Sequence, residues 1–263
     1  MLRILRSLWR WRRLVARLAR REFRARYAGS ALGAAWAVLE PAVQFGLYLF
    51  VFAYFLGMRI ESNASVSSFG LYLVGGLVPY LALQEAVVRS ASLARSNAAL
   101  VRQVGLPLEV LLAGTLGAVV ARHAVAFGLV VAAAAAMGSL VWSQLPWLAV
   151  GVALLLALAL GLALALLPIG AFLPDVAPVV GTGTTVLFFL APIVYPPSAL
   201  PEAFGRYLYL NPLTGLADAF RAGIGLAPPA PRALAVTAAV ALVSLGAGAL
   251  VFERRAAAVR DLV

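Results

Sequence analysis

The sequence predicts an all-α integral membrane protein, and composition is the first reason. Of 263 residues, 63% are hydrophobic and only 12% are charged, and the mean hydropathy is +0.98. A soluble domain is usually about 45–50% apolar and about 25% charged, so these values argue against a soluble enzyme and against a disordered chain. At about 20 apolar residues per span, the length predicts six membrane-spanning helices with short connections.

Residues 1–26 predict an amphipathic helix that lies in the membrane interface. Ten of the 21 arginines fall here, against one acid, Glu22. On a helical wheel most of these arginines occupy one face, and apolar side chains with Trp9 and Trp11 occupy the other. Arginine suits anionic headgroups and tryptophan suits the headgroup boundary. A basic nucleic-acid arm and a cleaved signal peptide are less favoured, since the next apolar stretch has span length and no small-residue cleavage site.

Six apolar stretches follow, and polar or proline-containing segments separate them. The predicted spans are 37–57, 69–88, a span within 108–137, 147–167, 176–195 and 233–252. Residues 196–231 contain seven prolines and predict short re-entrant helices on the extracytoplasmic side, between spans five and six. Such backbone is tolerated at membrane depth only where it is buried in protein or lines a cavity.

The arginines between the spans predict the orientation. With the N-terminus inside, the cytoplasmic segments hold sixteen arginines and the outer segments hold four. Short cytoplasmic loops carry the excess of basic residues in membrane proteins. We therefore expect both termini to be cytoplasmic, in agreement with an even number of spans.

No catalytic or metal-binding constellation is visible in the sequence. The chain has no lysine, which excludes the phosphate-binding loop that ATPases build around a lysine. It has no cysteine and a single histidine, His123, and its ten acids are scattered. We expect no catalytic residue, no metal site and no cofactor on this chain, and therefore not an enzyme.

Three segments resemble ABC-2 type polysaccharide export permeases. They are RYAGSALGAAW at 26–36, LVRQVGLPLEVL at 100–111 and LFFLAPIVYPPSALPEAFGRYLYLNPLTGLADAFR at 187–221, and they occur in family order. The resemblance implies the permease subunit of an ATP-driven transporter that exports an O-antigen-like, lipid-linked polysaccharide across the bacterial inner membrane. An ABC-2 exporter of a drug or small lipid is the alternative. A membrane enzyme acting on a polyprenyl-linked sugar would need clustered acids or histidines, which the sequence lacks.

The same resemblance implies an organisation and a set of partners. Residues 1–35 would form a cytoplasmic interfacial helix and gate loop, and 36–263 a six-span ABC-2 transmembrane domain. The partners would be a second copy of the chain, two copies of an ATPase subunit that holds ATP and Mg, a polyprenyl-linked glycan and membrane lipid, with no nucleic acid.

The resemblance also implies site residues at both ends of the pore. The cytoplasmic gate loop would comprise Tyr27, Gly29, Ser30, Leu32 and Gly33, or the segment would be a simple hinge. The ATPase would dock on Leu93, Arg95, Leu100, Val101 and Arg102, unless this segment is a plain solvated loop. The extracytoplasmic gate would include Tyr209, Asn211, Pro212, Asp218 and Arg221, where the alternative is a static outer loop.

Aromatic side chains would line the channel, because their faces hold sugar rings by weak and repeated contacts. The candidates are Tyr48, Phe52, Phe55, Phe188, Phe189 and Tyr195, which otherwise would face lipid or pack helices together.

Arg122 is a charged residue within the third predicted span. Such residues usually face the bundle interior and pair with an acid. The favoured partners are Glu40 and Glu85, ahead of Asp175, and direct contact with a phosphate-linked glycan is the alternative. Because neighbouring residues of a helix point about 100° apart, His123 is not expected to share the partner of Arg122.

Overall fold

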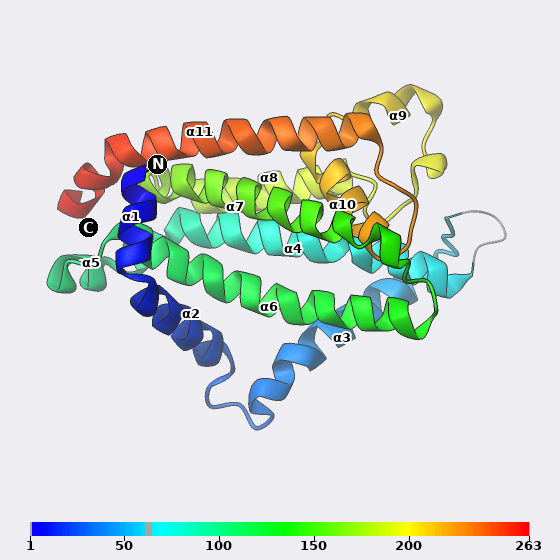
Figure 1. Ribbon diagram of the computed structural model, residues 1–263, viewed down its shortest axis with the longest axis horizontal. Helices are drawn as coiled ribbons and strands as arrows, with labels where there is room; N and C mark the ends of the chain where they lie inside the picture. The colour runs from blue at the N-terminus through cyan, green and yellow to red at the C-terminus, as the bar shows by residue number, and fades with distance from the viewer. Residues whose placement is uncertain (1, 61–64, 263) are drawn as a thin grey trace.

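The computed structural model describes residues 2–60 and 65–262, and these ranges form helices joined by turns, without a strand among them. Long helices run side by side as a bundle (Figure 1). They are α4 (Val66–Ser96), α6 (Leu108–Ala136), α7 (Pro146–Phe172) and α11 (Pro231–Leu262), with the shorter α8 (Val176–Phe189) beside them. Five helical stretches of the described chain are long and apolar enough to cross a membrane.

The fifth predicted span is shorter than expected. Helix α8 has 14 residues, about 21 Å at 1.5 Å per residue, whereas the hydrocarbon core of a bilayer is about 30 Å thick. The helix ends at Phe189, and Pro192, Pro196 and Pro197 follow within a run of turns. Proline has no N–H to donate to a helix, which explains why the predicted stretch to Tyr195 is not helical throughout.

Helix α4 lies at the centre of the bundle. In its most apolar window 72% of the residues are buried, against 6% for the stretch Gly33–Phe55. The Ser65 hydroxyl caps its start by accepting the N–H of Ser68 at 3.1 Å. The helix continues to Ser96, beyond the predicted end of the second span at Val88. The short helix α5 (Ala98–Val104) follows and ends at Gly105, whose φ of 62° is left-handed.

Glycines allow close contact between helices α7 and α11. A Cβ added at Gly161 of α7 would collide with the backbone of Ser244 and Leu245 in α11. A Cβ at Gly248 of α11 would collide in turn with the Gly161 backbone. Small residues that let backbones approach are typical of helix pairs in membranes.

The basic N-terminal segment forms two helices, α1 (Leu2–Arg10) and α2 (Arg12–Tyr27), where one was expected. Its apolar side packs on α6, with Leu18 against Gly114 and Ala19 against Gly117. Helix α1 and the chain termini lie at one end of the bundle, where α5 also lies (Figure 1).

Helix α3 (Trp36–Leu49) leaves the bundle at an angle and ends in a π-helical turn, Phe50–Phe55 (Figure 1). Helices α9 (Glu202–Leu208) and α10 (Pro212–Gly223) lie at the end of the bundle opposite the termini. Asn211 and Pro212 start α10 with a side-chain cap and a proline in the first turn. Helix α10 packs against α4, α7 and α11, so its backbone is enclosed by protein.

Candidate functional site

The predicted gate loop is a tight turn that joins α2 to α3. Ser30 stabilises it: its hydroxyl donates to the Tyr27 carbonyl at 2.9 Å and accepts the N–H of Gly33 at 3.0 Å. Gly29 and Gly33 have φ values of 80° and 48°, which glycine adopts without steric cost. Tyr27 is buried at the end of α2, whereas Leu32 is 51% exposed.

An ion pair closes this loop at its base. The Nη2 atom of Arg26 donates to Oε1 of Glu40 at 2.6 Å, which links the end of α2 to α3. The hydrogen bond with Glu40 raises the pKa of Arg26 above its ordinary value. Both side chains are more than 40% exposed. The ion pair therefore links α2 to α3 at the base of the loop and remains accessible to solvent.

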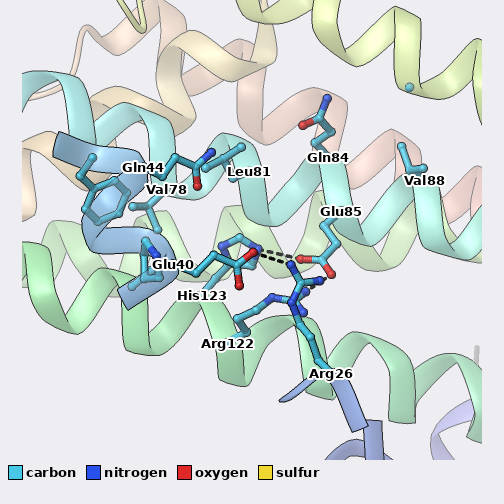
Figure 2. Close-up of a pocket in the computed structure, with 14 residues that line it drawn as sticks. Arg26, Glu40, Gln44, Val78, Leu81, Gln84, Glu85, Val88, Arg122 and His123 are labelled. Atoms are coloured by element: carbon cyan, nitrogen blue, oxygen red, sulfur yellow. Dashed lines mark hydrogen bonds and ion pairs between the residues drawn. The ribbon is translucent and has the colours of Figure 1, made fainter. Parts of the chain in front are cut away.

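A cavity of about 430 Å³ opens behind the loop (Figure 2). Helices α2, α3, α4 and α6 contribute to its wall, and so does α8 through Gly181. Its polar lining consists of Arg26, Glu40, Gln44, Gln84, Glu85, Arg122 and His123. Apolar residues, among them Phe45, Val78 and Leu81, complete it. Polar groups at this depth of an apolar helix bundle are expensive, and in membrane proteins they mark functional paths.

Glu85 is the partner of Arg122. The Arg122 Nη2 forms an ion pair with Glu85 Oε1, and the Arg122 side chain is 11% exposed. Of the three acids that the sequence offered, Glu40 pairs with Arg26 instead, and Asp175 lies in the turn before α8. Figure 2 shows Glu85 reaching from α4 toward α6.

The expectation that His123 and Arg122 would not share a partner is wrong. The His123 Nε2 lies 3.0 Å from Glu85 Oε2. The two side chains do diverge from the helix, but Glu85 faces α6 between them. Its two carboxylate oxygens each contact one of the neighbours, a possibility that helical spacing alone does not reveal.

The same carboxylate is connected to the N-terminal helix. Arg89, one turn along α4, lies 3.5 Å from Glu85 and 2.7 Å from Glu22 of α2. Glu22 also accepts the hydroxyl of Thr115 on α6 at 2.8 Å. The polar network therefore ties α2, α4 and α6 together. Sequence reasoning missed the contacts of Glu22, Arg89 and Thr115, because neither residue type nor spacing shows that these three side chains meet.

The outer candidate residues form a second cluster. Arg221 is 3% exposed, and its Nε donates to the Tyr72 carbonyl at 2.9 Å. Its Nη2 donates to the carbonyls of Pro192 and Ile193, and the guanidinium lies 3.5 Å from the centre of the Tyr72 ring. Asp218, three residues earlier, lies 3.6 Å from Arg221 Nη1. Helix α8 ends before Pro192 and Ile193, so their carbonyls have no helical N–H partner. The Arg221 guanidinium donates hydrogen bonds to both carbonyls instead.

Tyr209 and Asn211 lie beside this cluster. Tyr209 lines an outer cavity of about 280 Å³ together with Tyr72, Asp218 and Arg221. The Asn211 amide donates to the Leu187 carbonyl at 2.7 Å, which fastens the start of α10 to α8. Tyr72 was not among the predicted site residues, since nothing in its sequence neighbourhood separates it from other span aromatics.

The candidate docking residues divide into buried and exposed groups. Leu93 and Val101 are buried in an apolar cluster, so they hold α5 in place. Arg102 is exposed, and its guanidinium lies 3.5 Å from the Leu262 carbonyl. Arg95 donates to the Pro174 carbonyl at 3.1 Å, in the turn between α7 and α8. Leu100 is partly buried.

The candidate channel aromatics differ in how deeply they are buried. Tyr48 stacks on Phe52 with their ring centres 6.1 Å apart, while Phe55 is 78% exposed. Phe188 is buried against Tyr80, whereas its neighbour Phe189 is exposed. The Tyr195 hydroxyl donates to the Phe189 carbonyl at 2.7 Å. Of the six candidates, Phe188 acts in helix packing, and Phe55 and Phe189 are exposed.

No group of three His, Cys, Asp or Glu side chains in residues 2–60 and 65–262 is placed to hold a metal ion. The polar cavity is built from arginine–carboxylate pairs and amides, which bind charged and hydroxyl-bearing ligands through hydrogen bonds.

The chain is similar in sequence to known polysaccharide export and transport proteins. The chain is 28% identical over 259 residues to the O-antigen export system permease protein RfbA of Myxococcus xanthus, with 97% of each chain covered. It is 25% identical over 215 residues to the polysialic acid transport protein KpsM of Escherichia coli, covering 78% of each. An RfbA of Klebsiella pneumoniae is 22% identical over 213 residues, which cover 79% of this chain and 78% of that protein.

A family profile matches the region that holds most of both polar clusters. The ABC-2 type transporter profile aligns with residues 13–224, which begin in α2 and end just after α10. This range includes the gate loop, the polar cavity and the Arg221 cluster. The protein is thus a member of the ABC-2 type transporter family.

Proposed function

We propose that the chain is the permease subunit of an ATP-driven exporter of lipid-linked polysaccharide. The observation that carries the proposal is the match to an O-antigen export permease over 97% of both chains. The polar cavity supports it, because an amphiphilic substrate needs a polar path through an apolar bundle. The cavity opens beside α3, which belongs to Gly33–Phe55, the least buried of the five long apolar stretches of the described chain.

The assembly that we propose has two copies of this chain and two copies of a separate ATPase subunit. ATP and Mg would bind to the ATPase, because this chain has no lysine for a phosphate-binding loop. The exposed part of α5, at Arg102, would contact it. Purified alone, the chain should not hydrolyse ATP, and hydrolysis by a preparation free of the ATPase would contradict this assignment.

The arrangement that we propose in the membrane has six crossings, with α8 and the turns after it as the fifth. Helices α9 and α10 would form the re-entrant outer gate. The termini would lie in the cytoplasm at the inner membrane, where the arginines of α1 and α2 meet anionic headgroups. The location of α1, α5 and the termini at one end of the bundle agrees with this topology.

Deletion of the gene tests the proposed function. Cells without the protein should lack a surface polysaccharide and accumulate its lipid-linked precursor inside. Expression of the protein should restore the surface polymer and remove the precursor. Unchanged surface glycans together with increased sensitivity to a drug would favour the alternative, a drug or small-lipid exporter.

A further inference from the structure

The outer cavity of about 280 Å³ lies beside α10, at the end of the bundle opposite the termini (Figure 1). Helix α10 supplies Thr214, Asp218 and Arg221 to its wall, and α4 supplies Tyr72. The turns after α8 and the connection from α10 to α11 complete it. Pockets for small ligands begin at about 300 Å³, so the outer cavity has room for one small ring.

The charges of the outer cavity balance each other. Asp218 and Arg221 are the charged side chains among its described lining residues, and their Oδ1 and Nη1 atoms lie 3.6 Å apart. An anionic ligand would be repelled by the Asp218 carboxylate, and a cationic ligand would be repelled by the Arg221 guanidinium. The outer cavity therefore favours a neutral ligand.

The side-chain oxygens on the wall are free to accept hydrogen bonds. The Tyr72 hydroxyl already donates to the Pro192 carbonyl at 2.8 Å, and the Thr214 hydroxyl donates to the Leu208 carbonyl at 2.6 Å. Both hydroxyl oxygens keep lone pairs that can accept, and the Asp218 carboxylate is an acceptor only. A ligand that matches this wall must therefore bring several donors.

Asp218 is the group best placed to receive those donors. Its side chain is 23% exposed, whereas that of Arg221 is 4% exposed. The 3.6 Å between them is too long for a hydrogen bond, and among the described residues Arg221 Nη1 has no hydrogen-bond partner. The guanidinium is anchored on backbone carbonyls through Nε and Nη2 instead. Arg221 thus compensates the charge of Asp218 and leaves its oxygens available to a ligand.

We propose that the outer cavity binds one neutral sugar ring of the exported polysaccharide. This inference rests on the proposed function and adds a site for the polymer at the end of the bundle where it would leave. Two neighbouring sugar hydroxyls can donate to the two oxygens of the Asp218 carboxylate. Tyr209, Ile60 and Leu226 line the same cavity and offer apolar surface to the C–H face of the ring.

The bound ring would contact segments that are far apart in the chain. Ile60 precedes α4, Pro197 follows α8 and Pro228 precedes α11, and all three line the outer cavity. A polymer unit held between them would resist sliding back toward the cytoplasm. The affinity should be in the millimolar range, because a single ring makes few contacts and a tightly held ring would stop the polymer.

Saturation-transfer NMR on the purified protein in nanodiscs tests the site. The probes are the neutral methyl glycosides of glucose, galactose and mannose, and at least one of them should bind with a millimolar dissociation constant. Methyl glucuronide should bind several-fold more weakly than methyl glucoside, because its carboxylate would face Asp218. Binding of none of the neutral probes, or equal binding of methyl glucuronide, would overturn the proposal.

Two variants test whether the probes bind in the outer cavity. Ala227→Trp puts a large side chain at an exposed position of the cavity wall and should abolish binding. Ala258→Trp, at an exposed position near the opposite end of the bundle, is the matched control and should bind as the wild type does. Asp218→Asn should weaken binding about tenfold, because the charged acceptor is lost.

The unfolding temperature of each variant shows whether it folds. If Asp218→Asn does not fold, Ala227→Trp still decides, since it leaves the charged pair in place. Unchanged binding to a folded Ala227→Trp variant would locate the sugar elsewhere and overturn the proposal. The surface-glycan assay keeps the two levels apart. If surface polymer depends on the protein but the probes do not bind in the outer cavity, only this site fails, whereas the proposed function fails if no polymer depends on the protein.

Discussion

At the residue scale, Glu85 determines whether the charges of the cavity are tolerated. It contacts Arg122, His123 and Arg89, and two of these residues lie on another helix. Removing one partner of a buried ion pair leaves an uncompensated charge, which destabilises a protein by about 3–5 kcal/mol. If the arginine and the glutamate exchange positions, the two charges can pair again. Arg122 and Glu85 are therefore expected to depend on each other.

A charge swap tests this dependence. Arg122→Glu should lower the folded yield and the thermal unfolding temperature in detergent, because two carboxylates then face each other. Adding Glu85→Arg should restore part of both values. The measurements are the fluorescence-detected elution profile and the unfolding temperature of each purified variant.

The combination of Arg122→Glu with Glu40→Arg is the control for the swap. Glu40 pairs with Arg26 and has no ion pair with Arg122 in this structure, so this combination should not rescue. Rescue by Glu40→Arg but not by Glu85→Arg would contradict the pairing described here.

At the element scale, the contact between α7 and α11 depends on Gly161 and Gly248, because a side chain at either position would meet the backbone of the other helix. The Gly248→Val variant places two methyl groups against the Gly161 backbone and should destabilise the protein by about 1–3 kcal/mol or more. Gly246→Val is the matched control on the same helix, since a Cβ there meets nothing within 4 Å. In thermal unfolding, Gly248→Val should lower the unfolding temperature and Gly246→Val should leave it unchanged. An equal decrease in unfolding temperature for both variants would mean that valine weakens α11 itself and that the contact with α7 is not the cause.

Helix α5 carries the expected contact with the ATPase. Arg102→Glu should reduce co-purification of the ATPase several-fold and leave the amount of membrane-inserted chain unchanged, because Arg102 is exposed. Arg95→Glu is less informative, since Arg95 also holds the α7–α8 turn through Pro174. Arg232→Glu, near the opposite end of the bundle, should have no effect. Undiminished assembly of the Arg102 variant would place the docking surface elsewhere.

Most long helices were predictable from the sequence, whereas their ends were not. Apolar runs of span length identify α4, α6, α7 and α11 because burial in lipid or protein requires them. Apolarity does not mark where a helix continues past the membrane, so the extension of α4 to Ser96 was missed. The early end of α8 at Phe189 follows from the prolines after it, a local signal that a hydropathy window averages away.

The partners within the site were only partly predictable. A buried charge needs a partner, and this rule limited the candidate partners of Arg122 to a few acids, with Glu85 among them. Selecting Glu85, and finding that it also contacts His123 and Arg89, required the rotation of α4 against α6. That rotation follows from the packing of many side chains together. Local spacing accounts for the Asp218–Arg221 pair, because residues three apart share a helix face.

At the scale of the whole molecule, α5, the predicted gate loop and the Arg221 cluster follow one another along the bundle (Figure 1). Accessibility of single cysteines tests the orientation, because the chain has no cysteine of its own. Ala99→Cys and Ala258→Cys should react with a membrane-impermeant maleimide only after the inner face is opened. Ala227→Cys should react from the outer face. All three alanines are exposed, so each is a control for the others, and the reverse labelling pattern would invert the topology.

Helix α4 connects all three regions through one continuous backbone. Its 31 residues are about 46 Å long, with the Tyr72 carbonyl on Arg221 near one end, Glu85 further along, and α5 attached at the other end. Pro79 lies between Tyr72 and Glu85 and removes one hydrogen bond from the helix interior. One helical hydrogen bond fewer makes α4 easier to bend at Pro79 than elsewhere along its length. A bend there would move the segment that carries Glu85 and leads to α5 relative to the segment whose Tyr72 carbonyl accepts Arg221 Nε.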